Sequence, residues 1–116
     1  MKKILVITTI VLLLCMTACS NNEKSIEKQL QGTWYFTVNE IVSRYTFENG
    51  KYTPSIKYDG EIIPGGTGTY EIDIENSKIL VYFDDQRDGK PIEFPYDYQK
   101  GDLFLQFGEW TLIKEK

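Results

Sequence analysis

The stretch Leu30-Gln31-Gly32-Thr33-Trp34 decides the fold, because the residue pattern changes on either side of it. Before it, Ile26 and Leu30 stand four residues apart with polar residues between them, which predicts a short helix with one apolar side. From Trp34 onward, apolar and polar residues alternate, which predicts strands. Gly32 ends the helix, and Trp34 brings a large apolar side chain to the first strand.

The alternation continues toward the C-terminus in short runs that are separated by turns. Asn49-Gly50 lies between two β-rich runs and is a strong hairpin signal, and Asp59-Gly60 predicts another turn. Pro54 cannot donate to a strand ladder, so the strand over residues 51–58 should be an edge strand, bulged or broken. About eight short strands at regular spacing predict an all-β antiparallel meander, closed into a barrel or folded as a sandwich, with a short N-terminal helix.

Composition limits the chemistry that this chain can support. It has 116 residues, 26% charged and 41% hydrophobic, which fits one small globular domain. It contains no histidine, and its two cysteines, Cys15 and Cys19, both precede the predicted barrel. This argues against imidazole bases, disulfides and thiolate sites in the barrel. The net charge of −4 disfavours nucleic acid as a partner.

The first residues have the layout of an export signal. Met1-Lys2-Lys3 is basic, residues 4–14 are almost all apolar, and Met16-Thr17-Ala18-Cys19 follows. The last four residues resemble the lipobox of bacterial lipoproteins, which implies that Cys19 is acylated and becomes the first residue after cleavage. We therefore expect a lipoprotein signal peptide over residues 1–18.

The remaining chain divides into a tether and a domain. Residues 19–24 are small and polar, which predicts a lipidated tether. Residues 25–116 form the predicted barrel domain. We expect the protein to be extracytoplasmic and bound to the membrane through its N-terminal lipid, either at the cell surface or on a periplasmic leaflet.

Three motifs in order resemble the lipocalin-like (calycin) proteins, and most closely their small bacterial forms on secreted lipoproteins. The first is the Gly-x-Trp of Gly32-Thr33-Trp34, after a short helical segment. The second is the aromatic strand and hairpin of Tyr45-Thr46-Phe47-Glu48-Asn49-Gly50-Lys51-Tyr52, and the third is the Gly-x-Tyr strand of Gly68-Thr69-Tyr70-Glu71-Ile72. The resemblance runs from about Leu30 to Lys114.

This resemblance implies a barrel with one closed end. Trp34 should lie across that end, with a basic side chain of the last strand over it, and Lys114 is the residue available here. Because an eight-stranded barrel is only just wide enough for side chains or one small ligand, we expect a filled interior. The candidate inward-facing aromatic residues are Trp34, Phe36, Tyr45, Phe47, Tyr52, Tyr70, Phe83, Phe94 and Tyr96.

No motif for catalysis, a metal or a cofactor emerges from the sequence. The acidic segment Asp84-Asp85-Gln86-Arg87-Asp88-Gly89 lacks the ligand spacing of a calcium loop and predicts a solvated turn. Pro64-Gly65-Gly66-Thr67-Gly68 lacks the lysine and helix of a phosphate loop. Glu71, Asp73 and Glu75 alternate on one predicted solvent-facing side. We expect no enzyme and no cofactor.

The leading hypothesis is a lipid-anchored envelope protein with a non-enzymatic binding or interaction domain. One alternative is a carrier of a small apolar ligand in the barrel mouth, near Tyr45, Tyr70 and Tyr96. Another is an envelope protein that caps or inhibits a partner protein through an exposed apolar patch. The residues predicted for that patch are Leu80, Tyr82 and Phe104, which face away from the presumed core.

Overall fold

The computed structural model describes residues 22–85 and 89–116 of the chain. A helix covers residues 22–30, and the rest of the regular structure is β. The strands are β1 (Gly32–Val38), β2 (Ile41–Glu48), β3 (Lys51–Tyr58), β4 (Glu61–Pro64), β5 (Gly68–Asp73), β6 (Lys78–Phe83), β7 (Ile92–Gln99), β8 (Asp102–Phe107), β9 (Trp110–Thr111) and β10 (Ile113–Lys114). The pairings between these strands are antiparallel, which confirms the predicted all-β class.

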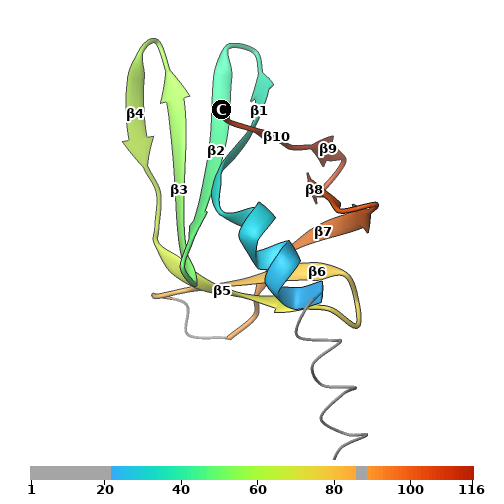
Figure 1. The fold of residues 1–116 in the computed structure, drawn as a ribbon. Helices are drawn as coiled ribbons and strands as arrows, with labels where there is room; N and C mark the ends of the chain where they lie inside the picture. Colours follow the sequence, from blue (N-terminus) through green and yellow to red (C-terminus); the bar gives the residue numbers. More distant parts are fainter. Residues whose placement is uncertain (1–21, 86–88) are drawn as a thin grey trace, which may run out of the picture.

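The sheet closes because its last segment contacts both of its ends. β9 pairs with β8, β10 pairs with β1, and only Leu112 separates β9 from β10. Leu112 is buried, and its N–H donates to the carbonyl of Leu105 at 2.8 Å. The strand order β10-β1-β2-β3-β5-β6-β7-β8-β9 therefore returns to its start as a nearly closed barrel (Figure 1).

Two details differ from the sequence prediction. The part of the chain that the structure describes has ten strand segments rather than about eight, because the last predicted strand bends at Leu112 and β4 pairs only with β3, outside the barrel order. The helix starts by residue 22, so residues 22–24 are helical although the sequence assigned them to the tether. Polar side chains do not prevent a helix at this position, because its apolar side is anchored further along, at Ile26 and Leu30.

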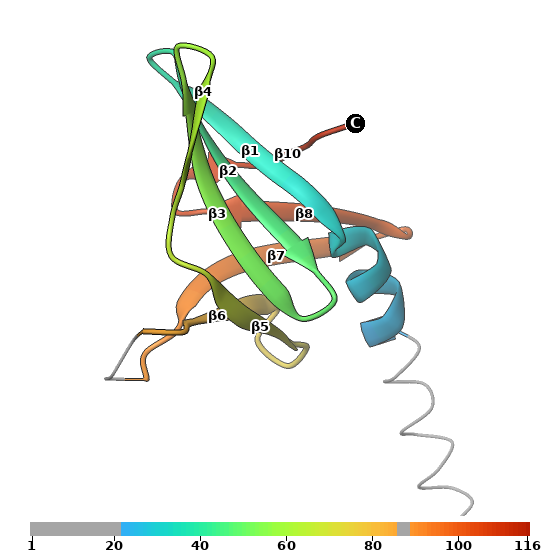
Figure 2. The same ribbon diagram turned by 90° about the vertical axis from the view of Figure 1, so that its left-hand side faces the viewer.

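β3 changes its partner halfway along its length. It pairs with β5 only through Lys51–Thr69 and Tyr52–Gly68, and beyond Pro54 it pairs with β4. Pro54 has no N–H, and its carbonyl accepts a hydrogen bond from the N–H of Gly65 at 2.9 Å. Because β3 leaves β5 at this point, the sheet of β1 to β4 extends well beyond β5 to β8 (Figure 2).

The core lies inside the barrel and under the helix. Ile26 and Leu30 of the helix are buried against it, as their spacing predicted. All nine aromatic residues that the alternation placed inward belong to the core or pack directly against it. The fully buried side chains include those of Phe47, Phe94 and Ile79. The alternation therefore identified the inward face of the strands correctly.

Gly68 is required where β5 approaches β6. A Cβ at this position would lie 3.1 Å from the Cα of Phe83 and would meet the backbone carbonyl oxygen of Tyr82. Because backbone atoms cannot yield as a side chain does, Gly68→Ala should lower the free energy of unfolding by about 1–3 kcal/mol. Urea denaturation followed by near-ultraviolet circular dichroism measures this change.

Gly66 provides the matched control for this substitution. Its added Cβ would lie 3.8 Å from the Phe83 ring, an ordinary contact, so Gly66→Ala should change stability by less than about 0.5 kcal/mol. Equal losses in Gly68→Ala and Gly66→Ala would contradict the steric account.

Candidate functional site

One end of the barrel is closed by the helix, Trp34 and Lys114. The buried indole of Trp34 donates its Nε1–H to the carbonyl of Leu30 at 2.9 Å. The Nζ of Lys114 lies 5.6 Å from the centroid of the Trp34 ring and donates to the carbonyl of Gln29. Two carbonyls at the helix C-terminus, which have no partner within the helix, are thereby satisfied. The structure thus brings Trp34 and Lys114 together.

Two glutamines attach the helix to the turns around this closed end. The Oε1 of Gln29 accepts the N–H of Leu103 at 2.8 Å, at the start of β8. The Oε1 of Gln31 accepts the N–H of Asn49 at 2.8 Å, in the turn between β2 and β3. The Nε2 of Gln31 donates to Glu27 and Tyr70. These bonds connect the helix to both sides of the barrel.

Tyr70 belongs to the closed end rather than to a mouth. Its hydroxyl donates to Glu27 Oε1 at 2.7 Å and accepts from Gln31. Burial raises the pKa of Tyr70, and the bond to Glu27 raises it further. A groove of about 540 Å³ runs beside it between the helix and β5, with Lys24 and Lys28 on its wall. The polar groups of Tyr70 and Glu27 in this groove already bond each other.

Tyr96 and Tyr45 lie elsewhere. Tyr96 stands beside Ser77, and burial raises its pKa while the Ser77 hydrogen bond lowers it. Tyr45 lines a different groove, of about 230 Å³, with Ser43, Ile56 and Ile63. Within residues 22–85 and 89–116, Tyr45 and Tyr70 therefore line separate grooves, and neither of these grooves includes Tyr96.

The opposite end of the molecule carries an exposed apolar surface, which we call the open face. Register places Ile41, Ile56, Tyr58 and Ile63 on the same side of the sheet as the inward-facing Tyr45. If other strands of the barrel lay opposite these positions, their side chains would be buried in the core. They lie instead in the part of β1 to β4 that extends past the end of β5. The open face consists of Phe36, Ile41, Ile56, Tyr58, Ile63 and Trp110.

Exposure distinguishes the open face from the core. Ile56, Tyr58 and Ile63 are 44%, 52% and 54% exposed, and Trp110 is 39% exposed. A monomeric protein seldom exposes so many large apolar side chains on one continuous surface unless that surface binds something. Among the described residues, the open face is the best candidate for a binding site.

Stacked rings connect the open face to the core. The rings of Trp110 and Phe36 lie 5.1 Å apart and are nearly parallel, at 7°. Phe36 stacks on Tyr45 at 6.2 Å, and Tyr45 meets the buried Phe94 edge-on at 5.2 Å. Because these rings support one another, Trp110 and Phe36 present a fixed aromatic surface.

A polar pair lies in the groove at the base of the open face. Burial raises the pKa of Tyr45, and a hydrogen bond with the Ser43 side chain opposes that rise. The Tyr45 hydroxyl therefore stays neutral near pH 7 and offers a single directional contact in an otherwise apolar groove. Such a site can orient a ligand but supplies no acid–base pair.

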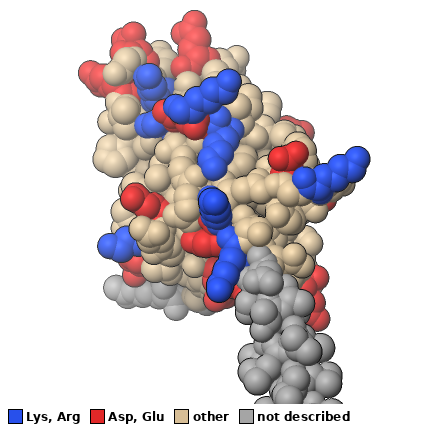
Figure 3. All heavy atoms as spheres, in the orientation of Figure 1, with Lys and Arg blue, Asp and Glu red and all other residues tan. Residues whose placement is uncertain are grey.

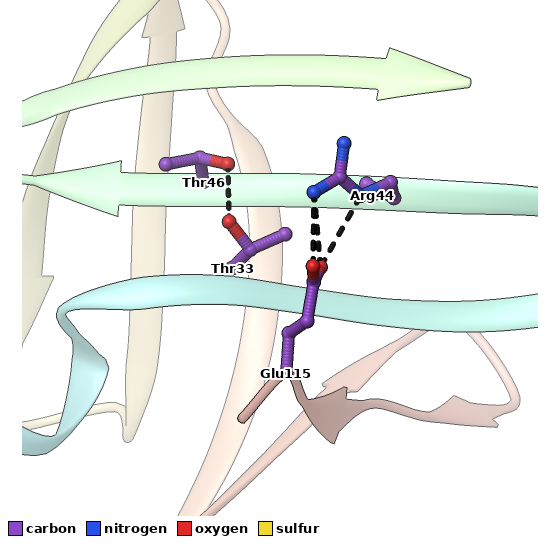
Figure 4. A network of polar contacts seen from close by, with 4 residues as sticks. All are labelled: Thr33, Arg44, Thr46 and Glu115. Atoms are coloured by element: carbon purple, nitrogen blue, oxygen red, sulfur yellow. Dashed lines mark hydrogen bonds and ion pairs between the residues drawn. The ribbon is translucent and has the colours of Figure 1, made fainter. Parts of the chain in front are cut away.

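The other side of the same sheet carries polar contacts where it covers the barrel. Arg44 reaches across β1 to Glu115, with Nη2 and Oε2 3.0 Å apart, and the hydroxyls of Thr33 and Thr46 lie 2.8 Å apart (Figure 4). These four residues face away from the barrel interior. Beyond the barrel this side is mixed, because Lys57 lies there between Val42 and Ile62, and Ile62 is 56% exposed.

The predicted patch of Leu80, Tyr82 and Phe104 does not match this surface. Phe104 is 49% exposed, but Leu80 and Tyr82 are half-buried, and Tyr82 donates to Glu71. Phe104 pairs with Asp97 on a different strand pair. The main exposed apolar surface lies on β1 to β4 and β9 instead.

Several predicted features lie outside the described residues or yield no site within them. Cys19 and the signal segment precede residue 22, and the acidic segment from Asp84 includes residues 86–88, which are not described. Among residues 22–85 and 89–116, no group of three or more acidic, cysteine or histidine side chains is arranged to hold a metal. Within the same ranges, no helix has both the length and the apolar character needed to cross a membrane.

Sequence reasoning missed Ile56, Ile63 and Trp110. Strand length gave part of the signal, because β2 and β3 have eight residues whereas β5, β6 and β8 have six, although β7 also has eight. Where β2 and β3 extend past the shorter strands, no strand of the described residues lies opposite to cover their inward-facing apolar residues.

No protein-family model matches the chain, and neither does any curated protein or solved structure. The structure supports a small, antiparallel, nearly closed barrel with one short helix, which is consistent with a calycin-like fold.

The buried Tyr52 makes stability sensitive to alkali. Burial, and then the neighbouring Tyr45, raise the pKa of Tyr52 above the usual value of about 10. Above pH 10 the unfolded state loses this proton more readily than the folded state, so stability present below pH 10 is lost as the pH rises toward the folded pKa. The slope is about 1.4 kcal/mol per pH unit for each such proton.

The free energy of unfolding should fall as the pH rises above 10. In Tyr52→Phe this fall should be less steep by about 1.4 kcal/mol per pH unit, the contribution of one proton. Urea titrations at several pH values between 8 and 12 measure it. Parallel curves for the two proteins would show that Tyr52 does not hold its proton in the folded state.

Proposed function

We propose that this chain is a lipid-anchored, extracytoplasmic protein of calycin type that binds an apolar partner or ligand on its open face and acts by binding rather than by catalysis. The observation that carries the proposal is the supported aromatic surface of Trp110 and Phe36, beside the exposed isoleucines of β3 and β4. A preformed surface loses little conformational entropy on binding, which favours affinity.

The size of the groove favours a partner over an enclosed ligand. Pockets that enclose small molecules usually measure about 300–1,000 Å³. The groove at Tyr45 has about 230 Å³, and the open face continues beyond it to Tyr58 and Trp110. A carrier of a small apolar ligand remains the second candidate function, and of the grooves beside Tyr45 and Tyr70 it is the one beside Tyr70, of about 540 Å³, whose volume falls in that range.

The position of the helix fits anchoring through Cys19. Two residues, which make three Cα–Cα steps, separate Cys19 from residue 22, where the described helix starts. These residues span about 10 Å when extended, so a lipid on Cys19 would hold the helix close to the membrane. The hairpins β1–β2 and β3–β4 end on the side of the molecule away from the helix start, so the open face would project away from the membrane (Figure 1).

The neighbouring residues Ile63 and Ile62 provide a matched test of the open face. They are 54% and 56% exposed, but only Ile63 lies on the open face, since it pairs with Ile56 while Ile62 pairs with Lys57. Ile63→Ser should weaken binding of an apolar fluorescent dye about three- to tenfold, because a half-buried isoleucine contact contributes about 1 kcal/mol. Ile62→Ser should leave binding unchanged.

Dye fluorescence titrations measure this difference, and Trp110 supplies an independent signal. The chain has two tryptophans, and Trp34 is buried. A change in tryptophan emission that disappears in Trp110→Phe therefore reports the open face. Equal weakening by Ile62→Ser and Ile63→Ser would contradict the proposed site.

Cys19→Ser tests the anchor. In a bacterial host fed labelled palmitate, the unsubstituted chain should incorporate label and fractionate with the membrane, because a diacylglyceryl group on Cys19 would supply the two acyl chains that stable anchoring needs. Cys19→Ser should lose both properties, whereas Cys15→Ser should keep them. A mature Cys19→Ser protein that remained lipidated would rule out this anchor.

A further inference from the structure

The distribution of charge around the open face indicates the kind of partner that it fits, given the proposed binding function on which this inference rests. Arg44, Lys51 and Lys57 are the basic residues of β1 to β4. Register places all three on the side of the sheet opposite Tyr45 and Ile56, because side chains alternate along each strand. The open face therefore receives none of the positive charge of its own sheet.

Carboxylates surround the open face instead. Glu61 pairs with Tyr58, so it lies on the open face itself. Glu40 lies in the turn next to Ile41, Asp59 in the turn between β3 and β4, and Glu109 directly before Trp110; all are exposed. Figure 3 shows acidic side chains at the outermost tips of the β1–β2 and β3–β4 hairpins. An apolar surface with an acidic border complements a partner that is apolar on one side and positively charged around it.

We propose that the open face binds a basic, amphipathic polypeptide segment, whose apolar side covers Trp110, Ile56 and Ile63 while its lysine or arginine side chains meet the acidic border. The apolar strip along β3 from Pro54 to Tyr58 is about 13 Å long, from the rise of a strand. Some nine residues of an α-helix cover that length. A negatively charged membrane surface does not fit, because the acidic border would repel it.

The edge of β4 shows how the segment docks. The N–H of Gly65 donates to the carbonyl of Pro54, and backbone groups alternate in direction along a strand. The N–H and C=O of Ile63 therefore point toward β3, whereas the backbone groups of Ile62 and Pro64 point away from it, to solvent. Pro64 has no N–H to offer, which leaves Ile62 as the outward donor of β4. An added strand would gain few hydrogen bonds here, so the partner binds through side chains, as a helix in a groove does.

Two model peptides of equal length and leucine pattern test this inference. One carries lysine at its polar positions and the other glutamate, and neither contains tryptophan. The full-length protein is held in nanodiscs of phosphatidylcholine, with empty nanodiscs as the blank, and Trp110 emission is followed during titration. The lysine peptide should bind, and the glutamate peptide should bind at least tenfold more weakly at low salt.

Neutralising the border should reduce that preference. The triple variant Glu40→Gln, Glu61→Gln and Glu109→Gln should weaken binding of the lysine peptide about three- to tenfold in 20 mM salt, as three exposed ion pairs allow. The effect should largely disappear in 0.5 M salt, where screening acts within a few ångströms. The matched control Glu48→Gln, Glu75→Gln and Asp102→Asn removes the same charge away from the open face and should change nothing.

The outcomes separate this inference from the proposed function. If both peptides bind equally, or if the two triple variants behave alike, the basic partner is wrong. In that case a loss of binding in Ile63→Ser would still support an apolar binding face. If neither peptide nor apolar dye responds to Ile63→Ser, the proposed function fails together with the inference.

Discussion

The hydrogen bond from the Trp34 indole to the Leu30 carbonyl is the contact on which the rest of this structure depends. A buried N–H without a partner costs about 1–3 kcal/mol, so the largest side chain of the core can stay inside only if the helix ends directly above it. Gly32 makes this possible, because its φ of 120° turns the chain from helix into β1 within two residues. Lys114 then covers the same indole and satisfies the preceding carbonyl, which joins the C-terminal strand to the helix. The order of helix, first strand and last strand is thereby fixed at one end of the barrel.

The two ends of the molecule differ because one is covered and the other is not. The same alternation of inward apolar residues runs through both. At the closed end the helix buries them, and Gln29 and Gln31 bind the turns around it. At the other end the sheet of β1 to β4 continues past the shorter strands, so residues such as Ile63 keep their inward orientation but lose their cover. The candidate binding surface thus has the apolar pattern of a core, but within the described part of the chain no strand or helix packs over it. The stacked rings of Phe36 and Trp110 stabilise its shape.

Alternation along single strands was enough to predict the barrel and its inward-facing aromatic residues, because the side of a strand on which a residue lies depends only on its local spacing. The height of a residue along the barrel depends on register with distant strands, which local spacing does not contain. For this reason Tyr45 and Tyr70 were both predicted to face inward, but the sequence did not show that Tyr70 lies under the helix and Tyr45 in a separate groove. Trp110 was missed for the same reason, because its partner Phe36 stands far away in the sequence.

The position of β10 has a consequence for the time course of folding. The barrel joins β1 to residues 113–114 through the pairs Trp34–Lys114 and Tyr35–Ile113. Until this pairing forms, β1 lacks one neighbour and the Trp34 ring lacks its lysine. The pairing joins residues about 80 positions apart, so it costs more loop-closure entropy than the hairpins between neighbouring strands. The barrel therefore closes only after its local hairpins have formed.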